Sequence, residues 1–134
     1  SIFEHGVDSS KYQCVFKPHP MCPVNQNRLS EIGLELFTGE IASLLAETDI
    51  MIATSPTSAA VEGFCLGIQI ILFHDGNGLN MSPLKDAREV LFISSSNELR
   101  DAVATSVQHP ANSHRPYFTL DDSLGRWSAF LRSL

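Results

Sequence analysis

The chain has 134 residues, which corresponds to one domain of ordinary size. Its nine Lys and Arg residues against fifteen Asp and Glu residues give a formal net charge of −6, so it lacks the excess of cations on which non-specific nucleic-acid binding depends. Hydrophobic residues make up 43% of the sequence, which suffices for a core, and no apolar run approaches the ~20 residues of a membrane-spanning helix.

The first part of the chain alternates short β-rich runs with short helical stretches. Pro18 ends the first β-rich run, and Gly39 precedes a stretch in which apolar residues recur at helical spacing. In chain order, we expect a helix end or linker over 1–11, a strand over 12–17, helical turns over 24–33, a strand over 34–38 and a helix over 40–48.

The second part repeats this alternation with longer apolar runs. Ser55 and Pro56 suit the start of a helix, and Gly67 suits its end. Ser95 and Glu98 have the spacing of a capping box. In chain order, we expect a strand over 49–54, a helix ending before Gly67, a strand over 68–73, a loop over 74–83, a strand over 90–93, and a helix through Val107.

A terminal helix completes this set of elements. Its apolar residues share one face at helical spacing, and we expect that face to dock on the domain. They are Leu120, Leu124, Trp127, Leu131 and Leu134.

Strands that alternate with helices predict an α/β fold with a Rossmann-like, doubly wound parallel sheet between helices. In such folds, ligands bind beyond the carboxyl ends of the strands. Polar residues and residues with special backbone preferences gather at four such ends, namely 17–20, 38–40, 54–58 and 74–76.

The first of these ends is Lys-Pro-His-Pro at 17–20. Two prolines restrict the backbone around His19, whose ring can donate a hydrogen bond to a phosphate or assist a leaving group. A rigid loop with an exposed histidine would explain the same residues.

The third end is Thr-Ser-Pro-Thr-Ser at 54–58, at the start of a predicted helix. The free N–H groups of a helix start favour an anion, and Ser55, Thr57 and Ser58 surround that point with hydroxyls. Helix capping alone is the competing interpretation, although it needs only one hydroxyl.

Two carboxylates and one glycine complete the candidate set. Glu62 lies four residues after Ser58, where its carboxylate can accept hydrogen bonds from ribose hydroxyls, although a solvated helix position is the commoner fate of a lone Glu. Gly39 allows the backbone before Glu40 to approach a nucleobase, or simply forms a tight turn.

Other reactive residues point to no further chemistry. His74 and Asp75 are too few for a metal site, so we expect a turn there and no metal. Three cysteines without Cys-x-x-Cys spacing indicate reduced thiols in a cytoplasmic protein. Cys14 and Cys65 fall within predicted elements, and Cys22 is the one to test for reactivity. The sequence contains no P-loop, no Gly-x-Gly-x-x-Gly and no Gly-x-Ser-x-Gly.

The order of these motifs resembles the C-terminal half of GT-B-fold glycosyltransferases over about residues 12–108. A strand ending in Lys-Pro-His-Pro, a strand followed by Gly-Glu and a helix, and then Asp-x-x-Ile-x-x-Ser-x-x-Ser-x-x-x-Glu-x-x-x-x-Gly carry the likeness. It is greatest to bacterial enzymes of surface and capsular polysaccharide synthesis, including sialyltransferases and Kdo-type transferases with a His-Pro motif and a Ser-Ser/Thr motif.

The resemblance implies a role for each matching residue. His19 would contact the donor phosphate and stabilise the leaving nucleotide, and Thr57 and Ser58, with Ser55, would bind the same phosphate. Glu62 would hold the ribose hydroxyls. Gly39 and Glu40 would lie near the base. The acidic motif that supplies the general base in these sialyltransferases belongs to the N-terminal half and has no counterpart here.

We therefore expect residues 1–134 to form one nucleotide-sugar-binding domain, a fragment of a two-domain glycosyltransferase that is inactive without its N-terminal acceptor-binding half. The donor is a nucleotide-sugar, with CMP-linked donors favoured, and no other cofactor is required. The full protein would be cytoplasmic, and peripheral association with a membrane is compatible with the sequence. Two alternatives remain, a half-domain of a nucleotide-sugar epimerase that does not use NAD and a non-catalytic α/β interaction module.

Overall fold

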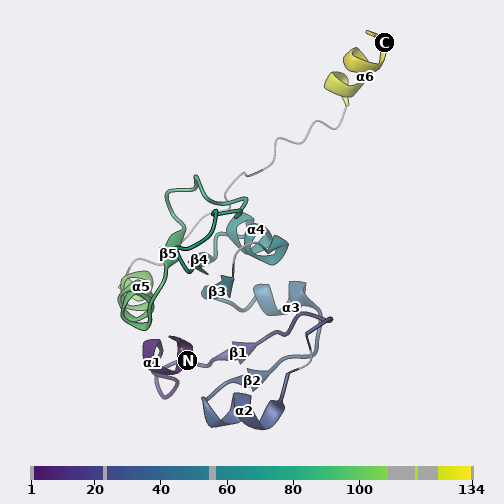
Figure 1. Ribbon diagram of the computed structural model, residues 1–134. Helices are drawn as coiled ribbons and strands as arrows, with labels where there is room; N and C mark the ends of the chain where they lie inside the picture. The colour runs from purple at the N-terminus through teal and green to yellow at the C-terminus, as the bar shows by residue number, and fades with distance from the viewer. Residues whose placement is uncertain (1, 23, 55–56, 109–116, 118–123, 134) are drawn as a thin grey trace.

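The structure is a computed structural model that describes residues 2–22, 24–54, 57–108, 117 and 124–133. Helices and strands alternate along most of the chain, as the sequence pattern predicts (Figure 1). The helices are α1 (Ile2–Gly6), α2 (Gln26–Glu31), α3 (Ile41–Leu45), α4 (Ser58–Cys65), α5 (Ser96–Gln108) and α6 (Gly125–Leu131). The strands are β1 (Val15–Phe16), β2 (Glu35–Leu36), β3 (Ile50–Thr54), β4 (Gln69–Phe73) and β5 (Leu91–Ile93).

The described strands form two parallel sheets. In the smaller sheet, β1 pairs with β2, with Val15 opposite Glu35. In the larger sheet the order is β3-β4-β5, with Ile50 opposite Gln69 and Ile71 opposite Leu91. The expectation of an α/β fold with parallel strands is therefore confirmed. The described strands make two hydrogen-bonded sheets where we expected one, and β1 and β2 pair over only two residues each.

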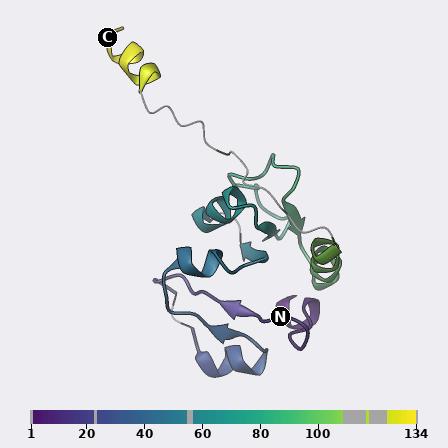
Figure 2. The same ribbon diagram turned by 180° about the vertical axis from the view of Figure 1, so that it is seen from behind.

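The larger sheet is covered by helices on both faces (Figure 2). Side chains alternate along β4, so that Ile70 and Leu72 contact one core cluster while Ile71 and Phe73 contact the other. The first cluster is completed by α4, by Leu45 of α3 and by two buried residues of the β4–β5 connection, which are Leu84 and Val90. Helix α5 and the region of α1 complete the second cluster, which includes Leu99, Ala102, Val103, Ile2 and Val7.

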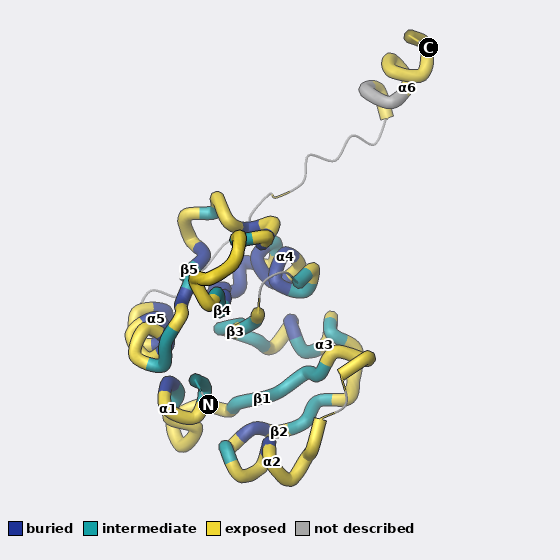
Figure 3. Tube along the Cα trace, in the orientation of Figure 1, coloured by how far each residue is buried: buried dark blue, intermediate teal, exposed yellow. Residues whose placement is uncertain are grey.

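Burial is deepest in β4 and falls toward the ends of the chain (Figure 3). Ile70 and Ile71 are fully buried, because β4 has a neighbouring strand on each side and a core cluster on each face. This explains the nearly continuous apolar run of this strand, which is typical of a central parallel strand. Ile52 in β3 remains more than one third exposed, since β4 is its only hydrogen-bonded neighbour among the described strands.

Two predicted helix boundaries are confirmed by their hydrogen bonds. Gly67 follows α4 with a left-handed φ of 85°, and its N–H donates to the Phe64 carbonyl at 3.0 Å. At the start of α5, the Glu98 N–H donates to Ser95 Oγ at 3.3 Å. The Glu98 carboxylate accepts from the backbone N–H of Ser94 at 2.6 Å, one residue earlier than in the usual capping box.

The expectation that the terminal helix docks on the domain is wrong for its described residues. Helix α6 lies apart from the two core clusters (Figures 1 and 2), and Phe130 and Leu131 are more than half exposed. Leu120, Leu134 and the Trp127 side chain of the predicted apolar face lie outside what the structure describes. None of the described helices combines the length and the apolar character that crossing a bilayer requires.

Candidate functional site

Two of the four predicted strand ends are joined by a hydrogen bond. Lys17, which directly follows β1, donates from Nζ to the carbonyl oxygen of Gly39 at 2.7 Å. The same ammonium lies 5.8 Å from the centre of the Phe37 ring. Because β1 and β2 are parallel, their carboxyl ends lie at the same edge, and Lys17 holds the two following loops together there.

Gly39 lies against the Phe37 ring of its own loop. A Cβ at this position would lie 2.7 Å from Cζ of Phe37, which is closer than carbon atoms pack. Its backbone carbonyl is already bound by Lys17. The carboxylate of the following residue, Glu40, is exposed and makes no capping hydrogen bond to α3. A side chain at position 39 would therefore displace the Phe37 ring, and the Glu40 side chain lies at the surface.

His19 forms a tight turn after β1. Its Nδ1 accepts a hydrogen bond from the Met21 N–H at 3.2 Å, and its carbonyl accepts from the Cys22 N–H at 2.9 Å. Because Nδ1 is an acceptor in this turn, the proton of the neutral ring is assigned to Nε2. The side chain is exposed, so the turn orients a hydrogen-bond donor toward solvent at the strand end.

The third strand end leads into α4. Thr57 is the N-cap residue with extended backbone angles, yet its side chain makes no capping hydrogen bond. Capping therefore does not account for this hydroxyl. Ser58 is the first helical residue and is exposed, as is Glu62 one turn later. Ser55 lies outside the described residues.

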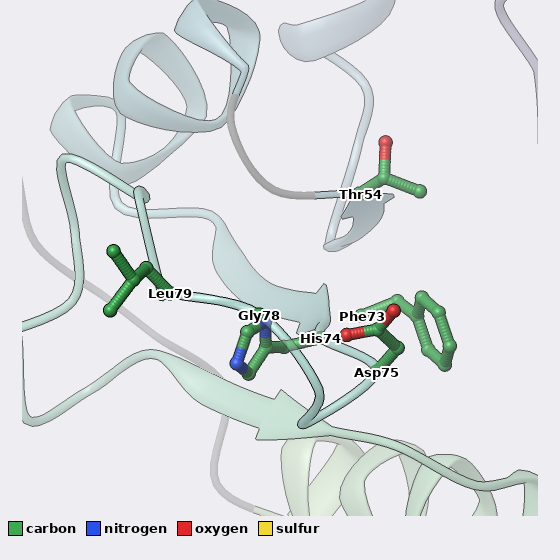
Figure 4. Close-up of a pocket in the computed structure, with 6 residues that line it drawn as sticks. All are labelled: Thr54, Phe73, His74, Asp75, Gly78 and Leu79. Atoms are coloured by element: carbon green, nitrogen blue, oxygen red, sulfur yellow. The ribbon is translucent and has the colours of Figure 1, made fainter.

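A depression of about 250 Å³ lies at the carboxyl ends of β3 and β4 (Figure 4). Its polar lining comes from Thr54, His74 and Asp75, and its apolar lining from Phe73 and Leu79, with Gly78 also at the wall. Asp75 Oδ1 accepts from the Asn77 N–H at 3.0 Å, and Gly76 has a φ of 75°, so the predicted turn is present.

The structure thus gathers part of the predicted site. Lys17 connects the loops of His19 and Gly39, while Ser58 and Glu62 share one helix. No hydrogen bond among the described residues joins these two groups. Sequence reasoning missed the role of Lys17 and the wall formed by Phe73 and Leu79. The signal for Lys17 was a cation directly after a strand, and the solvent exposure of Leu79 has no sequence signal.

Metal-ligating side chains and cysteines are the remaining candidates for chemistry in the described part of the chain. Within it, no group of three or more His, Cys, Asp or Glu side chains is arranged to hold a metal ion. Cys22 is exposed, and Cys14 and Cys65 are partly buried. Burial raises the pKa of the Cys14 thiol, which disfavours its reactive thiolate.

Comparisons with protein-family models, curated proteins and solved structures gave no significant match to this chain. The described residues form a small α/β fold in which parallel sheets pack against helices.

Proposed function

We propose that this chain is the donor-nucleotide-binding domain of a GT-B-type glycosyltransferase that uses a nucleotide-sugar in bacterial surface polysaccharide synthesis. In this proposal the domain is one Rossmann-like half of a larger cytoplasmic enzyme. The observation that carries it is the Thr57 hydroxyl, which stands at the start of α4 and makes no capping hydrogen bond there. An anion placed there would receive the hydroxyl and the free N–H groups of the helix start.

The other predicted residues fit the same ligand. The exposed Nε2–H of His19 would supply a second donor for the phosphate. Glu62, one turn into α4, would accept from the ribose hydroxyls. The depression lined by Thr54 and His74 offers space beside the phosphate position for the remainder of the donor.

In the proposed reaction, the bond between the anomeric carbon and the phosphate oxygen breaks while an acceptor oxygen bonds to that carbon. The electron pair of the broken bond leaves with the nucleotide, and His19 and the α4 N-terminus would stabilise the growing charge on its phosphate. The acceptor proton would pass to a base from the N-terminal half. The chain alone is expected to bind nucleotide weakly and to transfer nothing.

The test is a titration of ¹⁵N-labelled protein with CMP, CDP, UMP and UDP, followed by NMR. Saturable shifts are expected for residues 17–21 and 57–62, and the nucleotide with the lowest Kd identifies the donor class. His19→Ala should weaken binding by about tenfold, the effect of losing one charge-assisted hydrogen bond at an exposed site. His5→Ala on α1 is the matched control and should bind as the parent does.

Two results would change the proposal. Absence of saturable shifts up to about 10 mM of every nucleotide would exclude a donor site on this domain and favour an interaction module. Binding with release of free sugar from nucleotide-sugar alone, in the full-length protein, would favour the epimerase.

A further inference from the structure

Helix α6 exposes an apolar surface at a distance from both core clusters. Leu124, directly before the helix, is 58% exposed, and Phe130 and Leu131 are 55% and 64% exposed. In Figures 1 and 2, α6 lies beyond the end of the molecule that carries the 74–90 connection. More than half of each of these side chains is therefore open to solvent.

The sequence of this helix separates apolar residues from basic ones. At 3.6 residues per turn, the spacing of Trp127, Phe130 and Leu131 groups these positions within about one third of the helix circumference. Arg126 and Arg132 fall outside that sector. Segment 124–134 has no Asp or Glu, so it carries two positive charges in a chain whose net charge is −6.

This helix has little that stabilises it from within. It has seven residues, whereas isolated helices shorter than ~12–15 residues are marginal in water. Its N-cap residue, Leu124, adopts a left-handed φ of 52° and makes no capping hydrogen bond with its side chain. A surface that buries the apolar sector would supply the missing stabilisation.

A second exposed apolar group lies in the loop to which Tyr117 is bound. Leu79 and Met81 in the β4–β5 connection are 87% and 68% exposed. Tyr117 Oη donates to the Pro83 carbonyl at 2.8 Å, which holds the chain after α5 against this connection. Leu124 follows Tyr117 by seven positions in the chain, a reach of at most ~25 Å, so α6 begins within that distance of Tyr117.

We propose that α6 binds to the surface of an anionic lipid bilayer, with Leu79 and Met81 as a second contact. The apolar sector of α6 enters the boundary between headgroups and acyl chains, and Arg126 and Arg132 bind lipid phosphates. The charge of α6 favours a lipid surface over a protein partner. An apolar helix side flanked by arginines matches a bilayer, in which apolar acyl chains lie beneath negatively charged headgroups. This proposal does not require nucleotide binding, and the two proposals share one residue, Leu79, which also lines the depression at the ends of β3 and β4.

Trp127 is the only tryptophan of the chain, which makes it an intrinsic reporter of α6. Its emission should shift to shorter wavelength when vesicles of phosphatidylcholine with phosphatidylglycerol are added, and brominated acyl chains should quench it. Binding to phosphatidylcholine alone should be at least about tenfold weaker, as expected for two arginines near a charged surface. High salt should have the same effect.

Leu131→Glu should abolish vesicle binding, and Leu79→Glu should weaken it. Val24→Glu, next to α2 at the far end of the molecule, is the matched control and should bind as the parent does. Two outcomes would overturn the proposal. One is an emission already shifted without lipid and unchanged by vesicles, which would mean that α6 docks on its own domain. The other is a dimer, measured by light scattering, that Leu131→Glu dissociates, which would mean that a second copy covers α6.

Discussion

The contact between α1 and α5 depends on the absence of a side chain at Gly6. A Cβ built there would lie 2.7 Å from Cδ2 and 2.9 Å from Cβ of Leu99, a residue only 1% exposed. Cδ2 can move by rotating the side chain, but Cβ is fixed to the backbone of α5. We therefore predict that Gly6→Ala pushes α1 away from α5 and opens the core cluster that holds Ile2 and Val7.

Two opposing terms set the magnitude. Replacing a helical glycine by alanine stabilises a protein by about 0.5–1 kcal/mol where space allows. Carbon atoms pack at about 3.5–4.0 Å, so Gly6→Ala requires a displacement of ~1 Å in a packed core, which costs about 1–3 kcal/mol. The variant should be destabilised by about 1–2 kcal/mol. For 134 residues this lowers the Tm by ~4 °C per kcal/mol.

Two other glycines give the comparison that isolates the steric term. A Cβ at Gly78 meets no atom within 4 Å, so Gly78→Ala should leave the Tm nearly unchanged. At Gly63 it would lie 3.1 Å from Ile70 Cδ1, so Gly63→Ala should fall between the two. Thermal unfolding by circular dichroism, with urea unfolding for the free energies, measures all three. A Gly6→Ala variant as stable as the parent would refute the close approach of α1 to α5.

Three further outcomes are expected. Hydrogen bonds from Ser94 lower the pKa of the Glu98 carboxyl, so this group stabilises the fold above its ordinary pKa of 4.5, and the contribution is lost as the pH falls through the lower folded value. Glu98→Gln should accordingly be less stable than the parent in urea at pH 7. If this substitution lowered the free energy of unfolding as much at about pH 3 as at pH 7, the charge of Glu98 would have no role. Cys22 should react with a thiol reagent at least about tenfold faster than Cys14, because it is exposed while burial raises the pKa of Cys14; a fast phase that survives in Cys22→Ser would contradict this. Leu72→Ala should cost about 2–5 kcal/mol of unfolding free energy, since Leu72 is 1% exposed, and a loss below about 1 kcal/mol would contradict its place in the core.

Local chemistry explains which parts of the fold the sequence predicts well. Gly67 follows α4 because a left-handed backbone is needed there, and the glycine in the sequence indicates this directly. The capping spacing of Ser95 and Glu98 starts α5 for the same kind of reason. The apolar run over 68–73 predicts a buried strand, and β4 is this strand, paired with β3 and β5.

Features that depend on distant contacts were harder to predict. The run over 12–17 has the composition of a full strand, but only Val15 and Phe16 pair with β2. Nothing in the apolar face of the terminal helix says which surface it meets, so docking on the domain was inferred from amphipathicity alone. At the candidate site, motif spacing led us to propose His19 and Thr57. The Lys17–Gly39 bond joins residues 22 apart, and the position of Lys17 directly after a strand does not indicate this partner.

The pairing of α1 with α5 also orders the events of biosynthesis. Arg100 in α5 donates to the His5 carbonyl in α1 at 2.6 Å, across 95 residues of sequence. At translation rates of about 5–20 residues per second, α1 waits about 5–20 s for its partner. The cluster around Leu45, Phe64 and Leu72 needs only the middle of the chain and can close earlier. A ribosome-bound chain that stops before α5 therefore has one side of the larger sheet packed and leaves Ile71 and Ile93 on the other side uncovered by α5.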